Sequence, residues 1–174
     1  QEILLGTKKG MAIRFKEDDV RAMGRTAMGV IGIRMDADDE LVGMEILTEG
    51  HTILTVAERG YGKRTEVNEY RLQSRGGKGI INIRTTQKIG DVSGIKQVTG
   101  EEDIMLISST GNIIRLRVSE LPILHRSTQG VRLIELGPEE SLVGIARVER
   151  ETESREDDSA EEETAPEETE SAER

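Results

Sequence analysis

The sequence predicts an all-β protein, a propeller-like array of three four-stranded blades followed by a disordered acidic tail. The first observation is an internal repeat, because the same residues return after 50 and then 51 positions. A period of this length, built from short apolar runs, is typical of propeller-like arrays in which each sheet packs against its neighbours. The second observation is that each unit holds four such runs, the number of strands in a blade. The predicted units are residues 1–48, 49–99 and 100–148, and the predicted tail is residues 149–174.

Two glycines and two arginines define the repeat. After the first Gly of each unit, Arg stands four and fifteen positions later, and the second Gly stands nineteen positions later. The recurring residues are Gly10, Gly60 and Gly111; Arg14, Arg64 and Arg115; Arg25, Arg75 and Arg126; and Gly29, Gly79 and Gly130. So many matches at one offset indicate a structural repeat.

The apolar runs of each unit show the alternation expected of strands. In the first unit, Met11, Ile13 and Phe15 fall on one face of a strand that follows a Lys-Lys-Gly turn. A polar connection then leads to a second pair of runs. The predicted strands are 3–7, 11–16, 30–35 and 41–47 in the first unit, 53–57, 61–65, 80–85 and 92–98 in the second, and 104–108, 113–118, 131–136 and 142–148 in the third. We expect the four strands of each unit to form one blade.

The charge of the chain is divided between a neutral body and an acidic tail. The whole sequence carries a formal net charge of −10, and residues 149–174 alone hold 13 acids against 3 basic residues. A segment of this composition is expected to be disordered, because it has too little apolar surface to bury. Within the body, the middle unit is the most basic, with 9 Lys and Arg against 5 acids. Positive potential is therefore expected to peak in the middle unit.

Composition also limits the class of protein. The sequence has no Cys, no charged-then-apolar leader, and no apolar run near the roughly 18 residues of a membrane helix. We therefore expect a cytoplasmic protein with no membrane partner. Gln1 is not an initiator Met and runs directly into a strand pattern, so we expect the C-terminal piece of a longer protein. The scarcity of aromatic residues argues against a single-strand reader that stacks bases.

The sequence offers no catalytic, cofactor or metal constellation. The glycine-rich stretch at 75–79 lacks the spacing and the following helix of a P-loop. His51 and His125 have no Cys or paired carboxylates at ligand spacing. The acidic turn at 36–40 lacks the Gly and the Glu of a calcium loop, and Ser108 does not lie in a nucleophile elbow. We predict a chain without catalytic residues, cofactor or metal.

A periodic set of cations remains, and it suits phosphate. Arg25, Arg75 and Arg126 lie in the long polar connection of each unit, beside small residues that allow a phosphate to approach the backbone. Repetition by blade would place them around one rim, where they would bind and bend duplex DNA without reading its sequence. The candidate DNA-binding residues are Lys9, Arg25, Arg59, Lys63, Arg64, Arg71, Arg75, Lys78, Arg84 and Arg126.

The arginine set of Arg14, Arg64 and Arg115 allows two interpretations. An acid follows each of them five positions later, at Asp19, Glu69 and Glu120. An ion pair within each blade is therefore as well supported as a phosphate contact. No acid recurs near the second arginine of the units, so a phosphate contact is favoured there. Lys78 has no basic counterpart in the other units, and it is either a local specialisation or a simple solvated charge.

Several motifs resemble the C-terminal domain of the DNA gyrase A subunit. Segments 21–26, 60–65 and 127–131 resemble the repeats of that domain, and the similarity covers residues 2–148. One stretch looks like the family's box motif Q-[RK]-R-G-G-K-G, and it consists of Gln73, Ser74, Arg75, Gly76, Gly77, Lys78 and Gly79. The resemblance implies a six-bladed β-pinwheel that wraps DNA around its basic outer edge. It implies that wrapping presents a second duplex segment to the cleavage core and so supports ATP-driven negative supercoiling.

The resemblance also implies partners and marks two departures. The partners would be double-stranded DNA, the rest of the gyrase A subunit, plus the gyrase B subunit in an A2B2 heterotetramer, with ATP and Mg²⁺ used only by the parent complex. The family's defining box lies in its first blade, whereas the box-like stretch here lies in the middle unit and has Ser74 where a second base is usual. It resembles a degenerate copy. Two alternatives stay open: the C-terminal domain of the topoisomerase IV A subunit, or a protein-binding propeller, which the near-neutral body would suit.

Overall fold

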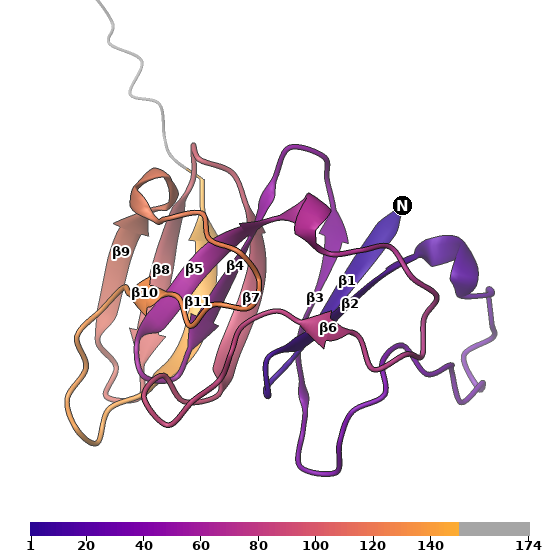
Figure 1. The fold of residues 1–174 in the computed structure, drawn as a ribbon, viewed down its shortest axis with the longest axis horizontal. Helices are drawn as coiled ribbons and strands as arrows, with labels where there is room; N and C mark the ends of the chain where they lie inside the picture. The colour runs from indigo at the N-terminus through magenta and orange to yellow at the C-terminus, as the bar shows by residue number, and fades with distance from the viewer. Residues whose placement is uncertain (150–174) are drawn as a thin grey trace, which may run out of the picture.

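The chain folds into three antiparallel sheets, each built mainly from the strands of one repeat unit (Figure 1). The computed structural model describes residues 1–149. The first sheet contains β1 (Glu2–Thr7), β2 (Met11–Lys16), β3 (Leu41–Leu47) and β6 (Ile80–Ile81); the second contains β4 (Thr52–Ala57), β5 (Tyr61–Glu66), β7 (Val92–Val98) and β10 (Val131–Arg132); the third contains β8 (Asp103–Ser108), β9 (Ile113–Arg117) and β11 (Leu142–Val148). The strand orders are β3-β1-β2-β6, β10-β5-β4-β7 and β11-β8-β9. The predicted all-β array of repeated sheets is confirmed.

Short turns take the place of helices in this fold. A single turn of 3-10 helix follows the second strand of each unit, at Glu17–Asp19 (η1), Val67–Glu69 (η2) and Val118–Glu120 (η3). In the described part of the chain, no helix is long and apolar enough to cross a membrane. Residues 150–174, which are all but the first residue of the predicted acidic tail, lie outside the described residues.

The third strand of a unit completes the sheet of the preceding unit. β6 of the middle unit pairs with β2, with Ala12 opposite Ile80, and β10 of the third unit pairs with β5, with Gly62 opposite Val131. The expectation that each unit forms its own four-stranded blade was therefore wrong. The predicted strands at 80–85 and 131–136 shrink to two residues each, and 30–35 forms only an isolated bridge between Ile33 and Gly77.

Backbone hydrogen bonds explain why these strands are so short. The amides of Asn82 and Ile83 both donate to the Gly10 carbonyl, at 2.8 and 3.2 Å. Two consecutive amides that converge on one carbonyl end the alternating ladder of an antiparallel pair. The chain then leaves the first sheet and enters the packing of its own unit, where Ile83 is 1% exposed.

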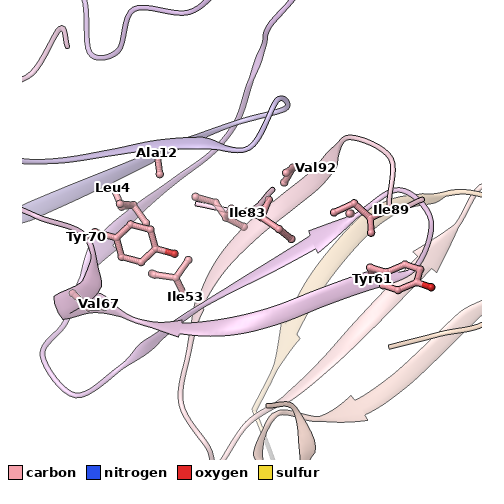
Figure 2. Close-up of a cluster of buried hydrophobic side chains, with 11 residues drawn as sticks. Leu4, Ala12, Ile53, Tyr61, Val67, Tyr70, Ile83, Ile89 and Val92 are labelled. Carbon is pink, nitrogen blue, oxygen red and sulfur yellow. The ribbon is translucent and has the colours of Figure 1, made fainter. Parts of the chain in front are cut away.

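The hydrophobic cores lie between sheets. The cluster in Figure 2 joins Leu4 and Ala12 of the first sheet to Ile53 and Val92 of the second. Tyr70 lies in the same cluster, where burial raises the pKa of its phenol and its hydroxyl donates to Asn82 Oδ1 at 2.6 Å. A second cluster joins the second and third sheets through Leu54, Val56, Val98, Ile104, Leu106, Val118, Leu121, Ile134 and Leu142. Each sheet is therefore stabilised largely by its neighbours.

The central strand β4 shows how the two cores are arranged. All six of its residues are buried. Ile53 belongs to the cluster shared with the first sheet and Leu54 to the cluster shared with the third, as the alternation of a strand requires. Glycine allows close approach on the side of the first sheet, where a Cβ on Gly43 would lie 2.6 Å from Ile95 Cγ1.

Candidate nucleic-acid interface

The first arginine of a unit binds the 3-10 turn of the next unit. Arg14 Nη1 donates to the carbonyls of Val67 and Tyr70 at 3.0 Å each, and its Nη2 lies 2.5 Å from Glu2 Oε2. Arg64 Nε donates to the Leu121 carbonyl at 2.9 Å, and Arg64 is only 9% exposed. These arginines therefore hold neighbouring units together.

An ion pair within the blade forms for Arg14, with Glu2, and for Arg115, whose Nε lies 2.7 Å from Asp103 Oδ2, but the acid is not the predicted one. In residues 1–149, the acid that follows five positions later is not the partner of Arg14, Arg64 or Arg115. Glu69 instead accepts a hydrogen bond from the Arg126 amide at 3.2 Å and contacts His125 Nδ1. The prediction that Arg64 contacts DNA was also wrong, because its guanidinium is buried and turned toward the next unit.

Lys63 is buried, which overturns its prediction as a DNA contact. It is 0% exposed, and its Nζ donates to Thr65 Oγ1 at 2.9 Å and to the carbonyls of His125 and Arg126 at 2.6 and 2.7 Å. These three bonds use all the donors of an ammonium group. Burial lowers the pKa of Lys63 to about 8. The side chain fastens the connection of the third unit to the second sheet.

The second arginine of a unit reaches back to the preceding unit. Arg75 Nη1 donates to the Ile31 carbonyl at 3.1 Å, and Arg126 Nη1 donates to the Ile81 carbonyl at 2.6 Å. The two acceptors are 50 residues apart, as the repeat requires. Arg75 Nε also donates to the Asp19 carbonyl at 2.8 Å. These contacts support a structural role for Arg75 and Arg126 and leave only part of each guanidinium for a phosphate.

Lys9 is compensated by acids. Its Nζ lies 3.1 Å from Asp91 Oδ2 and 3.8 Å from Asp38 Oδ2. The hydrogen bond to Asp91 and the attraction of both carboxylates raise the pKa of Lys9. The pair to Asp91 ties the β1–β2 turn to the loop before β7, so Lys9 adds little positive potential to the surface.

Five candidate cations are exposed and have no side-chain hydrogen bond or ion pair within residues 1–149. They are Arg25, Arg59, Arg71, Lys78 and Arg84. All except Arg25 belong to the middle unit. The loop with Arg84 is held in place through its backbone, because the Arg84 amide donates to the Thr128 carbonyl at 3.0 Å. We call Arg59, Arg71, Lys78 and Arg84 the middle-unit cations.

The glycines of the box-like loop serve close packing of the backbone. Gly79 has a φ of +74°, and a Cβ on it would lie 2.3 Å from the Ala12 carbonyl oxygen. Gly76 has a φ of +76°, and its amide donates to the Gly32 carbonyl at 2.6 Å. The loop therefore lies flat on the first sheet, and Lys78 is exposed on it.

Sequence reasoning missed a cluster around Tyr61. Lys88 Nζ and the Arg132 guanidinium lie 5.2 and 5.6 Å from the centre of the Tyr61 ring, and Arg132 Nη2 donates to the Tyr61 hydroxyl at 3.2 Å. This hydrogen bond lowers the pKa of Tyr61. Together with Arg59 and several glutamates, the cluster lines a cavity of about 620 Å³. No periodic signal marks it, because the third unit has Arg132 where the middle unit has Ile81.

The site holds no obvious place for a metal ion. Across the described residues, no group of three or more His, Cys, Asp or Glu side chains is arranged to hold one. What the geometry offers is a rigid stack of sheets with exposed, uncompensated cations on the loops of its middle unit. Such a surface suits a polyanion whose charges are spread along its length.

Comparisons with known proteins agree with the repeat. A family model described as "DNA gyrase C-terminal domain, beta-propeller" matches three times, at residues 1–48, 51–99 and 102–149. The DNA gyrase A subunit of Salmonella typhimurium is 46% identical over 147 residues, which are 84% of this chain and 17% of the relative. The DNA gyrase A subunit of Staphylococcus aureus is 45% identical over 155 residues, which are 88% and 18%. The chain thus spans less than a fifth of the length of these curated relatives.

Solved structures share the fold. A structure of the DNA gyrase A C-terminal domain matches with a TM-score of 0.79 at 26% identity, over 85% of this chain and 50% of that one. The C-terminal domain of DNA topoisomerase IV matches with a TM-score of 0.80 at 23% identity, over 85% of this chain and 46% of that one. Three matches to one family model, together with relatives of about 45% identity, show that this chain belongs to the family of DNA gyrase A subunits, within their β-propeller C-terminal domain.

Proposed function

We propose that this chain binds duplex DNA without sequence preference and wraps it, as part of the C-terminal domain of the gyrase A subunit. The observation that carries the proposal is the set of exposed middle-unit cations, which have no acidic partner within the described residues. Phosphate contacts of this kind supply affinity and position the duplex, and they carry no base information. The described elements include no helix of the length that enters a major groove.

The arrangement of the sheets supports the proposal of wrapping. Neighbouring sheets pack against each other through β3, β7 and β11. The side chains of Arg14 and Arg64 also donate hydrogen bonds to the next unit, so the loops of neighbouring units keep fixed positions. Bending a duplex costs elastic energy, and contacts with several units offset that cost. In the proposed function the wrapped duplex supports ATP-dependent negative supercoiling by a type II topoisomerase. The chain itself contributes no catalytic residue.

The partners of this function are proposed from the family. They are double-stranded DNA, the remainder of the gyrase A subunit, plus the gyrase B subunit, in an A2B2 complex in the cytoplasm. ATP and Mg²⁺ belong to the parent complex. The corresponding domain of topoisomerase IV is the alternative with structural support, but its likeness at 23% identity concerns the fold. The curated relatives favour gyrase.

A salt titration of variants tests the proposal. Lys78→Gln combined with Arg84→Gln should weaken binding of a labelled duplex and lower the slope of log affinity against log salt by about one unit for each lost phosphate contact. Arg117→Gln is the matched control, because Arg117 is exposed but lies 3.8 Å from Glu120 in the third unit. A double variant that binds DNA like the wild type would contradict the proposed site.

A further inference from the structure

The cavity around Tyr61 lies between the middle and third units. Its volume is about 620 Å³, and every residue that lines it falls between positions 58 and 141. Three segments meet there, which are the start of β5 with Tyr61, the loop before β7 with Lys88, and β10 with Arg132. The cavity is therefore formed by two units that the structure describes in full.

Three residues of this cavity depart together from the repeat. The equivalents of Tyr61, Lys88 and Arg132 at the boundary between the first and middle units are Met11, Asp38 and Ile81. The first boundary thus has one acid where the second has two cations and an aromatic ring. These three positions are far apart in the sequence and adjacent in space, so their joint change indicates a ligand of the cavity.

Tyr61 holds the two cations together. Lys88 Nζ and the Arg132 guanidinium both lie over its ring, 5.2 and 5.6 Å from the centre, where the ring stabilises them. Figure 2 shows the ring at the end of the buried cluster, with its hydroxyl pointing away from the other labelled residues. Two like charges held close together repel each other, and an anion bound between them removes that repulsion.

The Tyr61 hydroxyl completes a set of donors. It accepts a hydrogen bond from Arg132 Nη2 at 3.2 Å and keeps its own proton to donate. This hydrogen bond lowers the pKa of Tyr61, and the positive charges of Arg132 and Lys88 lower it further. Positive potential is therefore concentrated at the hydroxyl. A guanidinium, an ammonium group and a hydroxyl are together well suited to the oxygens of a phosphate group.

The loop that carries Lys88 is held on two sides by its backbone. The Arg59 amide donates to the Ile89 carbonyl at 3.0 Å, which ties the loop to the β4–β5 turn. The Arg84 amide donates to the Thr128 carbonyl at 3.0 Å, which ties the loop to the third unit. A ligand of the cavity would therefore order little additional backbone when it binds.

Two of the glutamates that line the cavity are already hydrogen-bonded to other groups. Glu140 Oε1 accepts from Thr110 Oγ1 at 2.5 Å and from Asn112 Nδ2 at 3.0 Å. Glu58 Oε2 accepts from the Asp91 amide at 3.2 Å. These carboxylates stabilise the turns around the cavity and do not pair with its cations.

Glu135 is the acid that competes for the site. Its Oε1 lies 3.5 Å from Arg132 Nη1, and its side chain is 86% exposed. An exposed pair of this kind contributes little free energy, so Glu135 can turn to solvent when an anion reaches Arg132. Glu139 also lines the cavity and is exposed, but within residues 1–149 neither it nor any other acid forms an ion pair with Lys88.

We propose that Tyr61, Lys88 and Arg132 form a phosphate-binding site between the middle and third units, with Arg59 at its edge. The ligand is a phosphate group, which comes either from the backbone of duplex DNA or from a free polyphosphate. The duplex as source rests on the proposed function, because Arg59 belongs to the middle-unit cations. The free polyphosphate as source is independent of it.

Titration of the full chain with inorganic pyrophosphate tests the site without DNA. The chain has no Trp and two Tyr, and Tyr70 is fully buried, so tyrosine fluorescence reports on the cavity. A saturable change is expected, and Tyr61→Phe should lose it. Lys88→Gln and Arg132→Gln should each weaken pyrophosphate binding by about tenfold, because each removes a charge-assisted hydrogen bond.

A second pair of residues in the third unit provides the control. Glu135→Gln should tighten pyrophosphate binding, because it removes the acid that competes for Arg132. Arg117 and Glu120 have the same sequence spacing and lie 3.8 Å apart, but they do not line the cavity. Arg117→Gln and Glu120→Gln should leave pyrophosphate binding unchanged.

Competition identifies the source of the phosphate. If the source is DNA, added duplex should displace pyrophosphate, and Lys88→Gln combined with Arg132→Gln should lower the salt slope of duplex binding by about one unit. Duplex that binds without displacing pyrophosphate would assign the site to free polyphosphates.

Two results separate this site from the proposed function. If pyrophosphate causes no saturable change and the double variant binds duplex with the wild-type salt slope, the site is overturned and DNA binding by the middle unit stands. If pyrophosphate binds as described but the chain binds no duplex, the site stands and the proposed function is contradicted. Equal pyrophosphate affinities of the wild type and the double variant would also overturn the site.

Discussion

Lys63 combines a basic side chain with complete burial. Its ammonium group binds two consecutive carbonyls of the third unit, so the charge stabilises a loop that belongs to a different sheet. Desolvation of this charge costs stability, which is why its pKa falls to about 8. Lys63 of β5 therefore has a structural role, and only the exposed cations of the same unit remain candidates for contact with DNA.

The burial of Lys63 predicts a pH dependence of stability. The pKa is lowered from 10.5 to about 8, so the unfolded chain binds more protons than the folded chain between these values. The contribution of Lys63 to stability should therefore rise as the pH increases through this window. Relative to Lys63→Met, the wild type should gain on the order of 2 kcal/mol in free energy of unfolding between pH 7 and pH 10. Urea titrations at both pH values measure the gain.

An exposed lysine gives the control for this prediction. Lys78→Met serves as the control, because Lys78 is exposed and its replacement removes a charge without removing a buried group. If the stability difference between wild type and Lys63→Met did not change between pH 7 and pH 10, the account of the Lys63 pKa would be wrong.

A substitution of Arg64 should affect the stability of the fold and leave DNA binding unchanged. Arg64→Met removes the hydrogen bond to the Leu121 carbonyl and leaves a buried acceptor without its partner. The free energy of unfolding should fall by about 1–3 kcal/mol. The salt slope of duplex binding should stay unchanged, because Arg64 is turned away from solvent. A reduced salt slope with unchanged stability would mean that Arg64 contacts DNA.

At the scale of elements, the repeat predicted most of the strands and missed how they are shared. The first, second and fourth strands of each unit form within one or two residues of their predicted ends, because their alternation is local information. The third run of each unit is also apolar, but its partner is a strand of the preceding unit. No pattern within residues 80–85 or 131–136 shows that these runs pair with a strand of the preceding unit. Nor does any pattern show at which backbone carbonyl the pairing ends.

The candidate site was predicted in part for the same reason. Exposure of Arg71 and Lys78 follows from their place in the polar connection of the middle unit, whereas Arg84 lies in a run that was predicted as a strand and is exposed because that strand ends at Ile81. Burial of Lys63 and Arg64 depends on the third unit lying over β5, which the sequence of the second unit does not encode. The Tyr61 cluster lies outside the repeat pattern altogether, because it combines residues that have no counterparts in the other units.

The second glycine of the repeat provides a test of the contact between the box-like loop and the first sheet. Gly79→Ala places a Cβ 2.3 Å from the Ala12 carbonyl, at a φ of +74°. Gly29→Ala meets no atom within 4 Å, at a φ of +82°, so it isolates the backbone penalty. Gly29→Ala should lower the free energy of unfolding by about 1 kcal/mol and Gly79→Ala by clearly more. Equal losses would mean that the loop does not lie flat on the first sheet.

At the scale of the whole molecule, charge is separated along the chain. The body is neutral, and the acidic tail carries the entire net charge of −10. If the middle-unit cations bind DNA as proposed, a polyanion tethered to the body should compete with DNA for them at a high effective concentration. Truncation after Val148 should therefore tighten duplex binding at low salt, and the two proteins should converge as salt is raised. Equal affinities of the full and truncated chains at low salt would mean that the tail acts only as a solubilising extension.

Family membership and geometry lead to one central claim, that the middle unit binds the phosphates of duplex DNA without reading bases. Its most direct test is the salt dependence of binding by this chain to two duplexes of unrelated sequence. The account predicts equal affinities for the two duplexes and a fall of log affinity with log salt whose slope corresponds to several phosphate contacts. A slope near zero, or a strong preference for one duplex, would contradict it.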